Sequence, residues 1–253
     1  PAIRLASATT RNWSIFIHLI NEDGIIEAQR DLYPGGGLLA TAETDPGESW
    51  SNPIAVKLPQ GLYTPQMLSV YLGFYDHPTN ERMLPVGETA DLDHDRVLIG
   101  QIRFDTPAGD IPNPVDVNFD DTMTLRGYTI TDRSLAPGDS TAITLYWSAQ
   151  HESLDNYVIS LQIIDAATLI KAAQDDNTPT PSTGTWTPGA TVTDTRTLTI
   201  APDAAPGRYR LLVRVYPYTD GVAGSPLRIR SSAGGQSEDF VWLSWMQVES
   251  AAE

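Results

Sequence analysis

The sequence predicts an all-β protein: two tandem antiparallel β-sandwich domains of immunoglobulin-like type, the first incomplete at its N-terminus. Three observations support this prediction. Apolar and polar residues alternate with a period of two in many short segments. Turn residues separate these segments about every 8–12 residues. One set of segments then recurs in the same order further along the chain, which indicates a repeat of domain size.

Composition narrows the class of protein. The chain has 253 residues, of which 41% are hydrophobic and 19% charged, enough for one large folded domain or two of ordinary size. It has no cysteine, which excludes disulfides, thiol catalysis and Cys-ligated zinc. No apolar run is long enough to insert this segment into a membrane. The formal net charge of −16 argues against nucleic acid and anionic lipid as partners.

The first copy begins with a short alternating piece at residues 3–7. Strands are expected at 13–20, 25–29, 54–58, 67–75 and 97–104, because apolar side chains alternate there. Turns are expected at 21–24, 45–48 and 76–81, and loops at 34–37 and 59–65, where Gly, Pro, Asn and Asp gather. Residues 105–116 carry three prolines and no periodicity, so they are expected to form a linker.

The second copy opens with two strands between Phe119 and Trp147, joined by a turn at 137–139. The strand at 157–163 then matches 13–19, and the strand at 239–248 matches 95–104, both at an offset of 144 residues. At the same offset, Asp175 is expected to match Asp31. The first copy has no counterpart of the strand at 124–130. The expected domains are therefore residues 1–104 (an incomplete copy), a linker at 105–116, and residues 117–253 (a complete copy), in a piece of a longer polypeptide.

Several turn and strand signatures carry a resemblance to a known family. They are Gly127-Tyr128, Pro137-Gly138-Asp139, Leu145-Tyr146-Trp147, Pro188-Gly189 and the run from Pro206 to Arg210. In this order they resemble the β-sandwich region appended to membrane glycosyltransferase-like proteins of Chloroflexi-type bacteria. Copy one departs from the pattern at 62–65. The resemblance implies a membrane-anchored parent polypeptide, a location on the extracytoplasmic side of the cell envelope, and no catalytic residue in this segment.

Aromatic residues are the main candidates for ligand binding, because a planar ring matches the apolar face of a sugar. The repeat aligns Trp245 with Gln101 and predicts that Trp245 faces outward. It aligns Trp242 and Ser244 with the core-facing side of the same strand. Trp186 and Tyr218 are second choices, placed near turns and without a face argument. The alternative is that these rings pack within or between domains.

The sequence gives little indication of a metal site or a catalytic motif. Asp91, Asp93 and Asp95 begin like a calcium loop, but Arg96 stands where an EF-hand needs Gly and Ile102 where it needs Glu. That excludes an EF-hand and leaves an irregular cation site or a solvated acidic loop. The four histidines are not at metal-ligand spacing, and no nucleophile elbow or phosphate loop occurs in the sequence.

These observations predict a non-catalytic, extracytoplasmic module of a larger envelope protein, with no cofactor. It is expected to be accessory to a membrane glycosyltransferase and to bind glycan or another envelope protein. One alternative is a structural or adhesive spacer, and another is a hydrolase with an unrecognised site.

Overall fold

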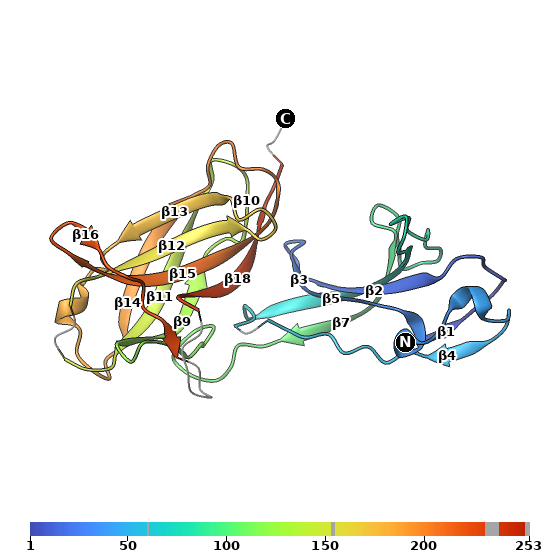
Figure 1. The fold of residues 1–253 in the computed structure, drawn as a ribbon, viewed down its shortest axis with the longest axis horizontal. Helices are drawn as coiled ribbons and strands as arrows, with labels where there is room; N and C mark the ends of the chain where they lie inside the picture. Colours follow the sequence, from blue (N-terminus) through green and yellow to red (C-terminus); the bar gives the residue numbers. More distant parts are fainter. Residues whose placement is uncertain (60, 153–154, 231–237, 251–253) are drawn as a thin grey trace. The chain divides into compact units, whose positions relative to one another are not determined.

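The computed structural model describes residues 1–59, 61–152, 155–230 and 238–250. Strands hold 49% of the residues and helices 4%, and most strand pairs are antiparallel, so the predicted all-β sandwich class is confirmed. The chain divides into two compact units (Figure 1). In their described residues, unit 1 is Pro1–Pro59 with Gln66–Phe104, and unit 2 is Gln60–Pro65 with Asp105–Glu253. The expected linker, 105–116, thus counts with unit 2.

Unit 1 is built on a five-stranded sheet in the order β3-β2-β5-β7-β6, accompanied by a two-stranded sheet of β1 and β4 (Figure 1). Its strands are β1 (Ala2–Arg4), β2 (Trp13–Ile20), β3 (Ile26–Leu32), β4 (Ser49–Ser51), β5 (Gln66–Asp76), β6 (Ala90–Asp91) and β7 (Arg96–Phe104). Two helical turns, α1 (Pro34–Gly37) and η1 (Thr41–Glu43), lie between β3 and β4.

The expected strand at 54–58 is wrong. The strand here is β4, which ends at Ser51, and the residues from 52 to 59 have no strand partner. Ile54, Val56 and Leu58 nevertheless pack against the core of unit 1. The alternation therefore reports side-chain burial correctly, while a ladder of backbone hydrogen bonds does not form there.

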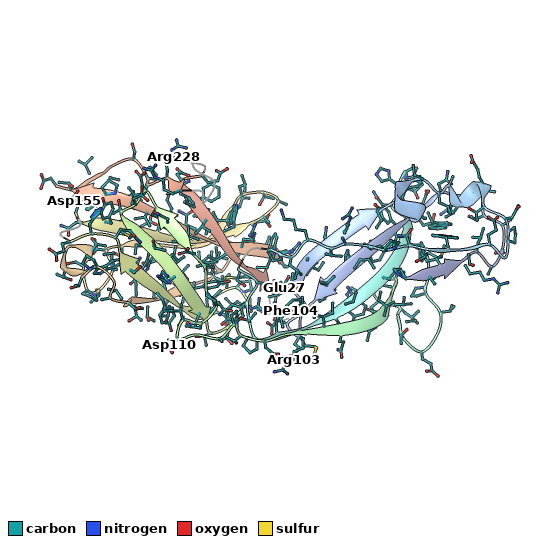
Figure 2. The ribbon with its side chains drawn as sticks, turned by 90° about the horizontal axis from the view of Figure 1, so that it is seen from below. Glu27, Arg103, Phe104, Asp110, Asp155 and Arg228 are labelled. Atoms are coloured by element: carbon teal, nitrogen blue, oxygen red, sulfur yellow. The ribbon has the colours of Figure 1, made fainter. Side chains whose placement is uncertain are left out.

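The core of unit 1 is small. Its buried members come from β2, β3 and β5: Ile15, Ile17, Leu19, Ala28, Leu68 and Leu72. At the end of β7, Phe104 packs against this cluster while Arg103 is exposed (Figure 2).

Unit 2 is a sandwich of two sheets. One has the order β10-β18-β15-β12-β13, with β16 paired to β15, and the other has the order β14-β11-β9-β8-β17. The strands are β8 (Val117–Phe119), β9 (Met123–Ile130), β10 (Ser134–Leu135), β11 (Ser140–Ala149), β12 (Tyr157–Asp165), β13 (Lys171–Asn177), β14 (Val192–Thr199), β15 (Gly207–Thr219), β16 (Val222–Ala223), β17 (Ile229–Arg230) and β18 (Phe240–Val248). A 3-10 turn, η2 (Thr183–Thr185), precedes β14. One core, with Trp147 and Tyr128 fully buried, lies between the two sheets.

The strand registers reproduce the repeat. Leu68 of β5 pairs with Ile102 of β7, and Tyr209 of β15 pairs with Met246 of β18, at offsets of 141 and 144 residues. Both strand pairs carry a bulge at the equivalent place, after Val70 in unit 1 and after Arg210 in unit 2. A bulge is a specific local irregularity, so its recurrence supports the equivalence of the two sheets.

The β12–β13 hairpin of unit 2 is shifted by one residue relative to the equivalent β2–β3 hairpin of unit 1. Phe16 pairs with Asp31, whereas its counterpart Ser160 pairs with Asp176 and not with Asp175. The turn after β12 holds one more residue, since Ile20 pairs with Ile26 but Ile164 pairs with Lys171. Asp176 is therefore the counterpart of Asp31.

A segment from between β4 and β5 belongs to unit 2. The Tyr63 hydroxyl donates to the Ile130 carbonyl at 2.7 Å and accepts from the Ile130 amide at 3.2 Å. The Tyr128 hydroxyl donates to the Gly61 carbonyl at 2.8 Å. The Arg133 guanidinium lies 4.5 Å from the Tyr63 ring centre. Residues 61–65 of the loop expected at 59–65 are thus anchored beside β9, whereas Pro59 counts with unit 1 and residue 60 lies outside the described residues.

Candidate functional site

The outer face of the β15–β18 strand pair is the leading candidate site. Tyr209, Leu211 and Val213 of β15 point into the core and are nearly or fully buried. Because side chains alternate along a strand, Arg210 and Arg214 point outward. On the neighbouring strand, three aromatic residues lie in register with this row: Trp245 opposite Arg210, Trp242 opposite Leu212, and Phe240 opposite Arg214.

These side chains stack on one another. The Arg208 guanidinium lies 3.4 Å from the Trp245 ring centre, and the Arg210 guanidinium lies 4.7 Å from it. Arg210 is also 5.2 Å from the Trp242 ring centre. The Phe240 and Trp242 rings meet edge to face at 5.4 Å. Guanidinium groups over aromatic faces attract the electron-rich ring. We call this set the aromatic–arginine ladder: Arg208, Arg210, Arg214, Phe240, Trp242 and Trp245.

Trp245 lies on the outward face that the repeat predicts, and it is partly exposed while its neighbour Met246 is buried. The expectation for Trp242 is wrong, whereas Ser244 is buried, as expected. The bulge after Arg210 places two residues, Leu243 and Ser244, opposite one, so the alternation shifts. Leu243 enters the core, and Trp242 joins Trp245 on the outer face.

Polar groups continue this face across the sheet. Ser160 pairs with Arg214, and Gln162 pairs with Leu212. The Gln162 amide donates to the Ser160 hydroxyl at 2.8 Å. Beyond them, Gln174 donates to the Asp176 carboxylate on β13. Ser160 and Gln162 are buried, so the exposed polar groups on this side of the sheet are those of Gln174 and Asp176.

Tyr218 lies near the end of β15 and is 41% exposed. It shares the outward parity of Arg210 and Arg214, so it is on the same face as Trp245. Eight residues of extended strand separate Tyr218 from Arg210, roughly 26 Å. Trp245 and Tyr218 therefore lie on one face but do not line one pocket.

Trp186 is not an exposed ring. Only 3% of it is accessible, its ring centre lies 6.3 Å from that of Trp147, and its indole nitrogen donates to the Pro181 carbonyl at 2.9 Å. It follows the η2 turn, as expected, but the turn directs the ring inward. Burial removes Trp186 as a ligand-binding candidate, because its ring presents no face to solvent.

The acidic loop is held by cationic partners. The Asp91 carboxylate lies 3.0 Å from His94 Nδ1 and accepts from Arg96 Nε at 2.7 Å. Partial burial would raise the pKa of Asp91, but the hydrogen bonds from His94 and Arg96 outweigh it and lower that pKa. Asp93 is exposed and Asp95 adopts a positive φ of 49°. Nowhere in the described ranges do three His, Cys, Asp or Glu side chains gather as metal ligands.

A buried charge cluster, which the sequence did not reveal, connects the two sheets of unit 2. Arg196 of β14 forms ion pairs with Asp194 at 2.8 Å and Asp175 at 2.9 Å. It also donates to the Ile159 and Asn177 carbonyls at 2.7 and 2.9 Å. Burial raises the pKa of Asp194, against the opposing effect of Arg196. The guanidinium is hydrogen-bonded to β12 and β13, so this cluster holds the two sheets together. We call Arg196, Asp194 and Asp175 the Arg196 clamp.

Comparison with known proteins finds similarity at the level of structure. No protein-family model matches the chain, and no curated protein sequence matches it. Among solved structures, the chain is similar to one titled "Crystal structure of the C-terminal domain of wzt". The TM-score is 0.34 and the sequence identity 11%, over 54% of this chain and 78% of that chain.

Proposed function

We propose that the chain is a non-catalytic carbohydrate-binding β-sandwich module, and that the aromatic–arginine ladder contacts the glycan. The observation that carries this proposal is the row of three rings and three guanidinium groups on the outer face of β15 and β18. An indole ring packs against the apolar C–H face of a sugar, and guanidinium groups donate several hydrogen bonds to its oxygens.

The finer proposal concerns the biological setting. We infer an accessory role beside a membrane glycosyltransferase, on the extracytoplasmic side of the envelope, with glycan or another envelope protein as partner. The support is the resemblance of the turn and strand signatures to appended β-sandwich regions. In the part of the chain that the structure describes, no helix is long and apolar enough to cross a membrane.

A second function, a structural spacer, is favoured by one observation. The Arg208 guanidinium lies only 3.4 Å from the Trp245 ring centre, so one face of that ring is already covered. If this contact is permanent, the ladder stabilises the sheet surface and leaves the ring less area for a sugar.

Calorimetric titration with bacterial envelope polysaccharides distinguishes the two functions. The variants are Trp245→Ala and Trp242→Ala, and the matched control is Tyr146→Ala, a partly exposed ring on the opposite sheet of unit 2. A ring at the centre of an interface contributes enough that its removal should weaken binding about tenfold. Unchanged affinity in both ladder variants, or no binding by the wild type, would favour the spacer.

A further inference from the structure

Unit 1 has a cavity on the outer face of its own sheet. Its volume is about 280 Å³, near the lower end of the roughly 300–1,000 Å³ typical of small-molecule sites. The lining side chains come from β2, β3, β5 and the turn that follows β5: Phe16, His18, Asp31, Tyr75, Asn80 and Arg82. A space of this size suits one sugar ring better than an extended chain.

A glycine shapes one wall of this cavity. Gly73 of β5 pairs with Phe16 of β2, and a Cβ atom on Gly73 would lie 2.1 Å from the Phe16 ring. Any larger residue would displace that ring. The Arg82 guanidinium lies 4.7 Å from the Phe16 ring centre and donates to the His94 carbonyl at 2.9 Å. These contacts hold both Phe16 and Arg82 in place.

The turn that carries Asn80 is also fixed. The backbone N–H of Asn80 donates to the Asp76 carbonyl at 2.7 Å, and the Thr79 hydroxyl donates to the Asp76 carboxylate at 2.7 Å. Asn80 adopts a positive φ of 59°, a conformation that Asn tolerates better than most residues. The Phe16 ring, the Arg82 guanidinium and the backbone at Asn80 are therefore held in place by surrounding contacts.

The polar groups of the cavity combine donors and acceptors. The Tyr75 hydroxyl donates to the Asp31 carboxylate at 3.3 Å. Burial, and then the negative charge of Asp31, raise the pKa of Tyr75, which keeps this hydroxyl protonated at neutral pH. The Asp31 carboxylate accepts hydrogen bonds, the Arg82 guanidinium donates them, and the side-chain amide of Asn80 can do both. Sugar hydroxyls also donate and accept, so they match this mixed set.

The charges discriminate among ligands. One carboxylate and one guanidinium line the same small space, since Asp31 and Arg82 both face it. An anionic ligand would be attracted by Arg82 and repelled by Asp31, and a cationic ligand the reverse, so neither kind of charge gains a net attraction. A neutral hydroxyl-rich ligand can accept from Arg82 and donate to Asp31 without a repulsive contact.

The repeat retains part of this arrangement. In unit 2, Asp176 and Tyr216 occupy the positions of Asp31 and Tyr75 on either side of the central strand. Burial, and then Asp176, raise the pKa of Tyr216, so the two groups interact there as well. Ser160 and Arg214 replace Phe16 and Gly73, so unit 2 lacks the ring wall at this place.

We propose that the unit 1 cavity binds a single neutral sugar residue through Asp31, Asn80 and Arg82. This inference rests on the proposed carbohydrate-binding function and adds to it a second site that does not use the ladder.

Two-dimensional amide NMR of the full chain, titrated with methyl glycosides of glucose, galactose, mannose and rhamnose, tests the proposal. We expect at least one glycoside to shift the amides around Phe16, Asp31 and Asn80. Asp31→Asn should weaken this binding about tenfold or more. Asn80→Gly, which keeps the backbone conformation of the turn, should also weaken it. The matched control Asp176→Asn in unit 2 should not.

The same spectra report whether each variant is folded, because shift dispersion is lost on unfolding. Methyl glucuronoside should bind no more tightly than methyl glucoside, since repulsion by Asp31 offsets the attraction of its carboxylate to Arg82. Trp245→Ala should leave the unit 1 shifts intact, which separates this site from the ladder. The proposal is overturned if no neutral glycoside shifts unit 1 amides at saturating concentration, or if folded Asp31→Asn and Asn80→Gly bind as the wild type does.

Discussion

Strands β7 of unit 1 and β18 of unit 2 are equivalent: each pairs with the equivalent long strand, β5 or β15, and each pair has a bulge. Their core-facing residues nevertheless differ in burial. Met246 of β18 is 1% exposed, whereas its counterpart Ile102 of β7 is 44% exposed. In unit 2 a five-stranded second sheet covers this side of the sandwich, and in unit 1 the second sheet consists of the short strands β1 and β4. Among the described residues, the main cluster of buried hydrophobic side chains has 26 members in unit 2 and six in unit 1.

This difference separates two determinants of the fold. Strand pairing and register come from local alternation and turns, which both units share. Burial comes from the opposite layer, which only unit 2 has in full. We therefore expect equivalent substitutions to have unequal energetic effects in the two units.

The largest expected difference is between Met246→Ala and Ile102→Ala. Truncation of a fully buried side chain leaves a cavity, so Met246→Ala should lower the free energy of unfolding of unit 2 by about 2–5 kcal/mol. Ile102→Ala should cost unit 1 less than about 1 kcal/mol, because the side chain is already partly hydrated. Urea unfolding followed by amide resonances of each unit measures both effects. Equal losses of stability would show that Met246 and Ile102 are equally buried by the opposite sheet in solution.

The next prediction concerns the segment from 61 to 65, which follows unit 1 strands in sequence but packs in unit 2. Tyr63→Phe removes two hydrogen bonds to Ile130 and leaves backbone groups without a partner. The free energy of unfolding of unit 2 should fall by about 1–3 kcal/mol, and unit 1 should be much less affected. Tyr33→Phe, at a ring 36% exposed in unit 1, is the control. A loss confined to unit 1 would contradict the assignment of this segment.

The outcomes show which features are readable from sequence. Alternation and the repeat were enough to predict the all-β class, many strand positions and the outward face of Trp245. The bulge that turns Trp242 outward was not readable, because one extra residue in a ladder leaves no composition signal. Trp186 was misplaced because proximity to a turn says nothing about the direction of a ring.

Contacts between segments far apart in the sequence could not be predicted either. The Arg196 clamp joins β12, β13 and β14, and the unit 1 cavity joins Asp31 of β3 with Tyr75 of β5 across β2. Each requires the register of three strands, and a shift of one residue would separate the partners. The repeat did supply one usable signal, since a Tyr and an Asp recur in both copies.

The smallest expected effect is a difference in pH dependence between Asp194 of unit 2 and Asp91 of unit 1. Burial raises the pKa of Asp194 in the folded state. Its stabilising contribution is therefore complete below the ordinary pKa of an aspartate and is lost as the pH rises through the folded-state pKa. For Asp91 the bonds from His94 and Arg96 lower the pKa despite partial burial. Its contribution is present above the ordinary pKa and is lost as the pH falls through the folded-state pKa.

Unfolding free energies of Asp194→Asn and Asp91→Asn, measured per unit from about pH 3 to pH 7, test these opposite signs. Relative to its variant, the wild type should lose stability in unit 2 as the pH rises above the ordinary aspartate pKa. In unit 1 the wild type should lose stability relative to Asp91→Asn as the pH falls below it. Asp93→Asn, at an exposed carboxylate in the same loop, controls for the general change in net charge. Slopes of the same sign at both sites would mean that the Arg196 clamp stabilises the ionised form of Asp194 more than burial opposes it, and the assigned direction would be reversed.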